Sequence, residues 1–333
     1  MNYVFKRLAQ AVFTLYAVVT LSFGLIQMLP GGPADYLRAQ MRQQGGTRMS
    51  AEELNRRIEA QYDVNEPIHQ QYIDYMASVL QGDLGESVRH GDVADVLAQA
   101  IPWTVFLLAT SLFLMFTIGV VLGAFMAYRE GSRFDLGSTG LSLVLNSTPY
   151  YVVALLLLTF LAYRTGLFPT GGHHASKLEP GLYPGFVLSV LHHAALPIAS
   201  LVVTGFGGWA LNMRGNSIRV LGEDYLRVAR LRGLSESRIA IRYVGRNAIL
   251  PMYTNLMIAI GGVFGGAIIL EQIFRYPGVG WYLINAIGQR DYPMMMGTFI
   301  IITVAVLLGV VIADLTYGWI DPRAKGGASR ESY

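Results

Sequence analysis

The side chains most concentrated for chemistry in this chain are the arginines of one polar stretch, Gly222–Pro251. Six arginines face only three acidic residues there: Arg227, Arg230, Arg232, Arg238, Arg242 and Arg246 against Glu223, Asp224 and Glu236. Guanidinium groups in such excess can pair with the carboxylates of a partner protein. The pattern predicts a docking element. A loop that is merely basic because it lies on the cytoplasmic side of a membrane is the alternative.

The same stretch has the helix signals needed to hold those arginines in place. Asp224 can open a first short helix, and Gly233 lies where that helix would end in a left-handed residue. Ser235, with Glu236 and Ser237, then starts a second helix, which we expect to stop before Pro251. The apolar side chains expected to contact a partner are Leu226, Val228, Leu231 and Leu234.

Residue types needed for enzymatic chemistry are missing or scattered. The chain has no cysteine, which excludes disulfides, thiol catalysis and cysteine-ligated metals. It also has no G-x-x-x-x-G-K-[ST] motif, so it lacks the phosphate-binding loop typical of ATP-hydrolysing proteins. The pairs His173-His174 and His192-His193 lack a nearby acidic cluster with ligand spacing, so a catalytic metal is not supported, although a soft surface site stays open.

Polar residues inside apolar runs are the candidates for a transport pathway. Asn146, Ser147 and Thr148 precede Pro149, and they either line a polar pathway or satisfy the carbonyls that the proline leaves free. Glu271 ends another apolar run, where a carboxylate is costly unless it faces water or a partner. We therefore expect Glu271 to make a polar contact near the pathway or a helix-stabilising pair.

The segment after Glu271 is rich in residues that break helices. Phe274, Pro277-Gly278 and Asp291-Tyr292 lie between two apolar runs. Proline and glycine here suggest a short re-entrant or gating turn, with aromatic residues at the membrane interface. An ordinary loop with an aromatic belt is the alternative interpretation.

The composition indicates what must position these residues. Of 333 residues, 53% are hydrophobic and 14% are charged, whereas soluble domains average about 25% charged residues. The apolar residues also come in runs long enough to cross a hydrocarbon core of about 30 Å. Six membrane-spanning helices are predicted: Leu8–Leu29, Pro102–Tyr128, Leu136–Tyr163, Phe186–Met213, Leu250–Leu270 and Met294–Gly318.

The distribution of positive charge predicts the orientation. Lys6 and Arg7 precede the first span, which places the N-terminus in the cytoplasm, and the first run is too long for a cleaved signal peptide. Six crossings then put loops 129–135 and 214–249 and the C-terminus inside, and these are the arginine-rich parts. Both termini are thus expected to be cytoplasmic, in a multi-pass inner (plasma) membrane protein.

Residues 30–101 are expected to form a helical extracytoplasmic insertion. They contain 11 acidic residues and 6 arginines, which is not the pattern of a cytoplasmic loop. Two helices are predicted in it, from Ser50 to about Tyr62 and from His69 to Leu80, the second closed by Gly82. The predicted division is therefore 1–29 (first helix), 30–101 (insertion), 102–320 (membrane core with the loop at 214–249) and 321–333 (tail).

Several short motifs, taken in order, resemble the inner-membrane permease subunits of ABC importers for dipeptides, oligopeptides and nickel. The likeness covers nearly the whole chain. Its motifs are Met28-Leu29-Pro30-Gly31, Gln70-Gln71-Tyr72, Gly82-Asp83-Leu84-Gly85-Glu86-Ser87, Thr148-Pro149-Tyr150-Tyr151, Gly166-Leu167-Phe168-Pro169, Asp224-Tyr225-Leu226-Arg227, Ala229-Arg230, Gly233-Leu234-Ser235, Arg246-Asn247-Ala248, Leu250-Pro251, Glu271-Gln272-Ile273-Phe274, Pro277-Gly278-Val279-Gly280, Arg290-Asp291-Tyr292-Pro293 and Asp321-Pro322-Arg323.

The resemblance implies an all-α permease fold and a role for the arginine-rich stretch. It would be the coupling loop that docks on an ATP-hydrolysing subunit, through Asp224, Tyr225, Arg227, Ala229, Arg230, Arg232, Gly233, Leu234, Asn247 and Pro251. The general permease signature has Glu-Ala-Ala followed by three residues and Gly, and only Ala229 and Gly233 match it here. The implied partners are a second homologous permease, two ATP-binding subunits, a substrate-binding protein and the lipid bilayer, with no nucleic acid.

The resemblance also implies that this chain is a transport subunit and not an enzyme. It would bind no cofactor itself, because ATP and Mg would sit on the ATPase subunits. Peptides are the expected substrates, with nickel and oligosaccharides as alternatives. Two other classes stay open: a secondary transporter, disfavoured by the absence of an obvious internal repeat, and a membrane-embedded enzyme, for which the polar residues are too scattered.

Overall fold

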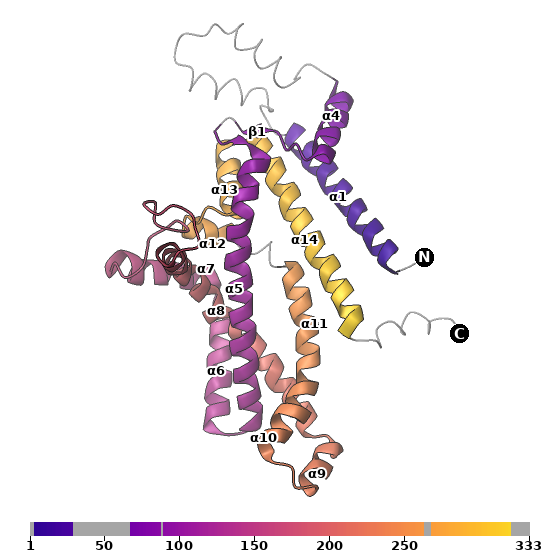
Figure 1. Ribbon diagram of the computed structural model, residues 1–333, viewed down its shortest axis with the longest axis vertical. Coiled ribbons are helices and arrows are strands. Elements are labelled where there is room, and N and C mark those ends of the chain that lie inside the picture. Colours follow the sequence, from indigo (N-terminus) through magenta and orange to yellow (C-terminus); the bar gives the residue numbers. More distant parts are fainter. Residues whose placement is uncertain (1–2, 29–66, 88, 263–267, 321–333) are drawn as a thin grey trace, which may run out of the picture. The chain divides into compact units, whose positions relative to one another are not determined.

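Two compact units divide the chain in the computed structural model, which describes residues 3–28, 67–87, 89–262 and 268–320 (Figure 1). One unit consists of Met1–Pro102 with Gly278–Ala305, and the other of Trp103–Pro277 with Val306–Tyr333. The described chain is mostly helical, as expected, apart from one two-stranded hairpin. The predicted helix from Ser50 to Tyr62 lies outside the described residues.

The first unit gathers short elements around an apolar core. Its elements are α1 (Tyr3–Gln27), α4 (Ile68–Gln81), β1 (Glu86–Ser87), β2 (Gly91–Asp92), the start of α5 (Val93–Tyr128), α13 (Val279–Gln289) and much of α14 (Tyr292–Ile320). The strands pair antiparallel, Glu86 opposite Asp92. Buried Val19, Val93, Leu97 and Met294 belong to the core, so elements far apart in sequence share one interior.

Helix α4 confirms one predicted element closely. It ends at Gly82, whose φ of 84° is the left-handed conformation that closes a helix. Polar contacts hold α4 against α1: the hydroxyls of Thr20 and Tyr72 lie 2.7 Å apart, and Gln27 donates to Gln71 over 2.9 Å. The aromatic ring of Phe23 also contacts Tyr72 edge-on. The sequence thus predicted this helix, but not the polar pairs that attach it.

The second unit contains the long apolar helices and the arginine-rich segment. Its elements are the rest of α5, α6 (Arg133–Ser147), α7 (Tyr150–Leu157), η2 (Leu158–Arg164, π-helical), α8 (Pro184–Leu221), α9 (Asp224–Leu231), α10 (Glu236–Arg238), η3 (Ile239–Gly245, π-helical), α11 (Arg246–Gly262), α12 (Ile268–Ile273) and the end of α14. Its largest core cluster includes Leu107, Leu158, Val202, Leu270 and Tyr276.

Helix α8 packs against α5 and α6 with backbones in close contact. A Cβ added at Gly207 would lie 2.5 Å from the Ser142 carbonyl oxygen, so α6 and α8 touch directly there. On α5, a Cβ at Gly119 or Gly123 would collide with the α8 backbone at Phe206 or with the Met213 side chain, at 2.8 Å in both cases. Only glycine permits this spacing, so the three helices meet along a seam with little side-chain material between them.

The predicted third span is broken where Pro149 lies. Helices α6 and α7 are bent by 90° at this point. Pro149 has no N–H to donate to the helix, and Thr148 before it is extended, with ψ 125°, because a following proline disfavours the helical conformation. The expectation of one helix running through Pro149 is therefore wrong.

Four helices are long and apolar enough to cross a membrane within the described ranges, or five if the bent pair is counted as one span. The four are Phe5–Leu25, Val93–Tyr128, Pro184–Leu221 and Tyr292–Ile312. The second begins at Val93, not at Pro102, which lies inside it. The predicted fifth span is only partly described, since residues 263–267 lie between α11 and α12. Several apolar spans are therefore present, and the number six stays a prediction.

Candidate functional site: the arginine-rich segment

The first helix of the arginine-rich segment, α9, has two different faces. Leu226 and Ala229 are buried, whereas Val228 and Leu231 leave 54% and 82% of their surface exposed. The expectation that Leu226 contacts a partner is therefore wrong, because its side chain is used inside the chain. An amphipathic helix normally buries its apolar face. In α9 apolar side chains remain outside as well, which leaves Val228 and Leu231 available for a contact.

The turn after α9 has the predicted geometry. Gly233 adopts φ 72°, and its N–H donates to the Arg230 carbonyl over 2.9 Å. The N–H of Leu234 donates to Ala229 over 3.3 Å, which satisfies another carbonyl of the last turn. A left-handed residue that redirects the chain is what the position of Gly233 predicted, and this prediction is confirmed.

The second helix of the segment differs from expectation at its end. Ser235 precedes α10, and the helical path then continues through the π-helical segment η3 into α11. Pro251 lies inside α11, so the prediction that the helix stops before it is wrong. A proline removes one hydrogen bond from a helix, and neighbouring packing can tolerate that loss in apolar helices.

A small core of its own stabilises the segment. Leu226 and Ala229 from α9 pack with Ile239 and Val244 from η3, and all four are buried. Partly buried Val220, Leu221, Leu234 and Tyr243 surround them. The two halves of the segment therefore form a packed helical hairpin, shown at one end of the second unit in Figure 1. This packing allows the segment to move as one piece.

Polar contacts attach the hairpin to neighbouring helices. Glu236 accepts hydrogen bonds from the Arg230 guanidinium, over 3.3 Å, and from the Tyr128 hydroxyl at the end of α5, over 3.0 Å. The Asn247 amide on α11 donates to the Tyr225 hydroxyl on α9 over 2.9 Å. Glu236 is therefore used within the chain, and it neutralises only one of the six arginines.

The remaining arginines stay open. All six are exposed, and among the residues that the structure describes only Arg230 forms an ion pair. The exposed apolar side chains of Val228 and Leu231 lie on the same helix as Arg227 and Arg230. The hairpin thus presents apolar groups surrounded by cationic ones, a composition suited to an acidic partner surface with an apolar centre.

An ion pair joins the start of α6 to the last part of α8. Asp135 is 1% exposed and accepts two hydrogen bonds from the Arg214 guanidinium, from Nε over 2.6 Å and from a terminal nitrogen over 2.7 Å. The Gly131 N–H donates to the same carboxylate over 3.0 Å. The sequence interpretation missed this pair, since its members lie in different predicted elements. The signal was available: an acid at the start of one span and an arginine at the end of another.

The polar triplet before Pro149 divides between the two predicted roles. The Thr148 hydroxyl donates to the Val144 carbonyl over 2.9 Å, which satisfies a group at the end of α6. Asn146 instead lines a cavity with residues of α8 and α11, and Ser147 is exposed. Asn146 and Thr148 therefore have different surroundings: Thr148 bonds to the helix backbone, and Asn146 lines a cavity. The role of Asn146 in a pathway stays a prediction.

Glu271 is fully buried in the second unit. Its side chain accepts a hydrogen bond from the Thr104 hydroxyl over 2.6 Å, so it joins α12 to α5. Phe274 is buried in the core cluster beside Tyr276. Burial raises the pKa of the Tyr276 phenol, and nearby Glu271 raises it further. Glu271 therefore makes a contact that joins two helices. A role of Glu271, Phe274 or Pro277 in a pathway stays a prediction.

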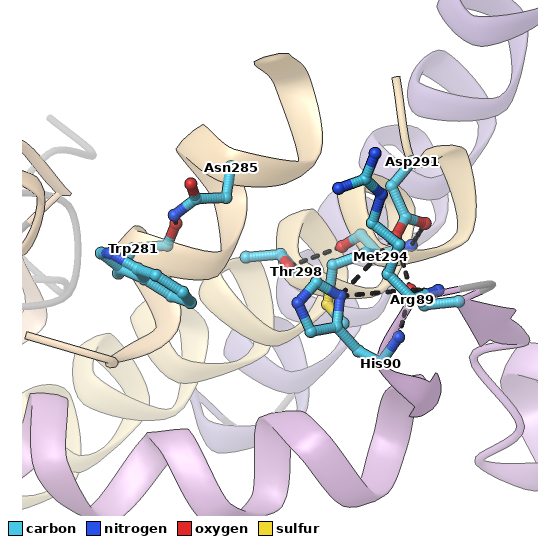
Figure 2. A network of polar contacts seen from close by, with 8 residues as sticks. Arg89, His90, Trp281, Asn285, Asp291, Met294 and Thr298 are labelled. Carbon is cyan, nitrogen blue, oxygen red and sulfur yellow. Dashed lines mark hydrogen bonds and ion pairs between the residues drawn. The ribbon is translucent and has the colours of Figure 1, made fainter. Parts of the chain in front are cut away.

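The other gate candidates belong to the first unit, where one of them, Asp291, is part of a polar network (Figure 2). Asp291, which is 2% exposed, accepts hydrogen bonds from the Ser87 hydroxyl over 2.5 Å and from the Met294 N–H over 3.2 Å. His90 lies 3.9 Å from the same carboxylate. Gly278 precedes α13, and Tyr292 is buried at the start of α14. Asp291 thus caps α14 and holds the β-hairpin, and its role as a gate stays a prediction.

The four paired histidines make separate contacts. His173 stacks on Trp103, with ring centroids 4.1 Å apart and an interplanar angle of 4°. His192 contacts the Leu167 carbonyl over 2.8 Å, and His193 contacts the Ser189 carbonyl over 2.7 Å. Within the described ranges no three histidine or acidic groups gather at metal-ligand spacing. The soft surface site that the sequence left open stays a prediction.

Known proteins resemble the chain over nearly its full length. The oligopeptide transport system permease protein AppB of Bacillus subtilis is 32% identical over 323 residues, which cover 96% of this chain and 98% of the relative. The corresponding protein OppB of Haemophilus influenzae is 31% identical over 327 residues, covering 98% and 99%. The dipeptide transport system permease protein DppB of Bacillus subtilis is 31% identical over 326 residues, covering 97% and 98%.

A family model matches residues 119–326, more than half of the chain. The matched range includes α6 to α11, and thus both the arginine-rich hairpin and the Asp135–Arg214 pair. Its description agrees with the several apolar spans of the structure and with the resemblance seen in the motifs. The chain belongs to the family of binding-protein-dependent transport system inner membrane components.

Proposed function

We propose that this chain is a permease subunit of an ATP-driven importer for dipeptides and oligopeptides. Its membership of a transport family and its relatives, which are oligopeptide and dipeptide transport permeases, support this assignment. The chain would form the translocation pathway with a second, homologous permease in the inner membrane. It would itself catalyse no reaction, and ATP and Mg would be bound by partner subunits.

The exposed cationic and apolar surface of the hairpin carries the coupling part of the proposal. Arg227, Arg232 and Arg238 are exposed and have no ion-pair partner among the described residues, and Leu231 is largely uncovered. If these arginines served only to hold the hairpin together, they would form ion pairs within it, as Arg230 does with Glu236. An ATPase subunit with an acidic groove would cover the apolar side chains and neutralise these arginines.

The assembly needed for such coupling has three kinds of partner protein: a second permease, ATP-binding subunits and a substrate-binding protein. Two ATP-binding subunits would contact the hairpins of the two permeases, and a substrate-binding protein would deliver peptide on the opposite side. Closure of the ATPase pair on binding ATP would draw the hairpins together and favour one conformation of the permeases over the other. Hydrolysis would release that bias, so that the pathway opens alternately to the two sides.

The proposed topology has six crossings with both termini in the cytoplasm. Under it, the hairpin and the loop containing Arg129 and Arg133 face the cytoplasm, in agreement with the excess of arginine there. The loops at 164–185 and 271–293 then face outward. Residues 30–101, which include α4 and the β-hairpin, would lie on the outer side as well.

Two importers of other substrates fit the same family, and a secondary transporter is an alternative outside it. An importer of nickel or of oligosaccharides would need the same subunits, and a secondary transporter would work without an ATPase. Purified chain in lipid vesicles distinguishes these: ATP-dependent uptake of tripeptides that requires the added permease, ATPase and binding protein supports the proposal. Uptake by the chain alone, driven by an ion gradient, would refute it.

The docking surface can be tested by charge reversal. Arg232→Glu should reduce peptide-stimulated ATP hydrolysis of the assembled importer at least tenfold, while the protein still inserts into the membrane. Lys177→Glu is the matched control, because Lys177 is also an exposed cation but lies in a different loop. Equal ATPase stimulation in both variants would show that the hairpin does not dock as proposed.

A further inference from the structure

A polar cavity lies among α6, α8 and α11 in the second unit. Its volume is about 310 Å³, at the lower end of the range for small-molecule sites, about 300–1,000 Å³. Three asparagines, one tryptophan and two glycines line it: Asn146, Asn212, Asn255, Trp209, Gly205 and Gly208. The lining therefore offers several side-chain amides and one aromatic ring, and it contains no charged residue.

The amides lie at a depth where polar groups are costly. Asn146 follows Arg133 by 13 residues along α6, which is roughly 20 Å at 1.5 Å per residue. Asn255 follows Arg246 by nine residues along α11, or roughly 14 Å. In the hydrocarbon region an amide needs a hydrogen-bonding partner, because lipid tails supply none. These side chains must therefore face water, another protein or a substrate.

Two of the three amides have no partner inside the described part of the chain. Asn146 and Asn255 are exposed and make no hydrogen bond to described residues, whereas Asn212 donates to the Gly208 carbonyl over 2.9 Å. That bond uses one N–H of the Asn212 amide and leaves its carbonyl oxygen as an acceptor. The cavity thus offers unpaired donors and acceptors together.

The walls of the cavity are built to keep the amides in place. A Cβ on residue 208 would come within 2.9 Å of the Asn146 oxygen, so glycine there leaves room for the amide. The Trp209 ring packs edge-on against Phe116, with centroids 5.3 Å apart and an interplanar angle of 78°. Its position is therefore fixed. It supplies a flat apolar wall beside the polar groups.

We propose that this cavity binds the main-chain amide groups of a peptide during its passage through the membrane; this inference rests on the proposed function. A peptide group has one donor and one acceptor, which side-chain amides complement in either direction. Because the lining carries no charge, the site tolerates cationic, neutral and anionic side chains alike. It offers no imidazole, thiolate or carboxylate, the ligands that nickel prefers.

The first test replaces the amides by an apolar side chain of similar size. In the complete importer, Asn146→Leu and Asn255→Leu should each lower ATP-dependent uptake of radiolabelled trialanine about tenfold. Asn216→Leu is the matched control, because Asn216 lies on α8 but does not line the cavity. It should stay within twofold of the unchanged protein. Co-purification of the second permease and the ATPase should be the same in all variants.

The second test introduces a negative charge into the cavity and measures which peptides the importer prefers. Asn255→Asp makes the site anionic, so the ratio of uptake of a lysine-containing to a glutamate-containing tripeptide should rise about tenfold. Asn216→Asp should leave the uptake ratio unchanged. The affinity of the isolated binding protein for each of the two peptides is measured as well, so that its own preference can be taken into account. A merely structural asparagine would lower uptake of both peptides equally.

The outcomes distinguish this inference from the function on which it rests. Normal peptide uptake by both leucine variants, or an unchanged uptake ratio in Asn255→Asp, would overturn the cavity site alone. Loss of the second permease from the purified leucine variants would also overturn it, by making the amides an interface. An unchanged importer that carries maltotriose or nickel but no peptide would overturn both proposals.

Discussion

Charged side chains meet opposite conditions in two regions of the second unit. At the junction of α6 and α8, Asp135 is buried and bonded twice to Arg214 and once to the Gly131 backbone. In the arginine-rich hairpin, exposed guanidinium groups largely lack a partner among the described residues, and Arg230 alone has one. The first region satisfies its charge within the chain, and the second leaves its charge outside.

The difference separates a structural role from an interaction role. A buried carboxylate without a partner would cost several kcal/mol, so burial and complete pairing must occur together. An exposed pair contributes roughly 0–1 kcal/mol, so nothing in the stability of the chain demands that the hairpin arginines be paired. Their number therefore needs a cause outside the stability of the fold, and docking on an ATPase subunit, as proposed above, would be such a cause.

The largest predicted effect comes from breaking the buried pair. Asp135→Asn should lower the free energy of unfolding by about 3 kcal/mol, because it leaves the partly buried Arg214 guanidinium without its counter-charge. Thermal unfolding in detergent measures the loss. Glu236→Gln, which removes the exposed counterpart, is the control and should change the midpoint little. A similar midpoint for both variants would contradict the contrast between the two regions.

A second prediction concerns a buried group that stays uncharged. Burial, assisted by His174 and His193, lowers the pKa of His173 from 6.5 to about 4. Between these values the unfolded chain binds more protons, so stability is full above about pH 6.5 and falls as the pH drops toward 4. The loss should reach about 2 kcal/mol, since one pKa unit corresponds to about 1.4 kcal/mol and the ring is only partly buried.

The stacked pair of rings provides the measurement. Protonation of His173 should change the fluorescence of Trp103, which is in contact with it. A difference titration between the unchanged protein and His173→Gln isolates this signal from the other tryptophans, and it should show a midpoint near pH 4. A midpoint near 6.5 would mean that His173 is solvated, unlike the other buried groups.

A third prediction tests the turn of the hairpin. Gly233→Val should cost about 1–2 kcal/mol, because an L-residue with a side chain is strained at φ 72°. A Cβ there has open space around it, so the cost is in the backbone alone. Hydrogen exchange of the α9 amides should become faster in this variant. Gly233→Asn is the matched control, since asparagine accepts this conformation; equal exchange in both would remove the strain argument.

The smallest predicted effect is at the exposed ion pair. Arg230 and Glu236 have side chains that are 47% and 56% exposed. Arg230→Gln should therefore change the free energy of unfolding by less than about 0.5 kcal/mol in denaturant titrations. A loss comparable to that of Asp135→Asn would show that the hairpin depends on its surface charge, against the comparison drawn above.

Local signals in the sequence predicted the turns well. Gly82 and Gly233 both take the left-handed conformation expected after a short helix. Glycine adopts this conformation without the steric cost that a side chain would bring. Helix α4 was predicted within one residue at either end. The existence of several apolar spans likewise follows from composition. These features depend on neighbouring residues, so the sequence shows them directly.

Long-range contacts were missed for the opposite reason. Asp135 and Arg214 lie 79 residues apart. An acid at the start of one span and an arginine at the end of another were visible in the sequence, but their neighbours do not show that the two residues pair. The break at Pro149 was missed although Asn146, Ser147 and Thr148 precede the proline, because a proline inside a membrane span can also be accommodated without a break. The split of α9 into a buried and an exposed face was also unclear, since Leu226 and Leu231 are the same residue type and only packing separates them.

The seam along α8 has a mechanical consequence. Gly207, Gly119 and Gly123 bring the backbones of three helices together, and the Asp135–Arg214 pair clamps one end of the seam. Flexible side chains would absorb a push by changing rotamer, but main chain resting on main chain has no such slack. We therefore expect the three helices to move together, as one rigid group, when the hairpin end is displaced.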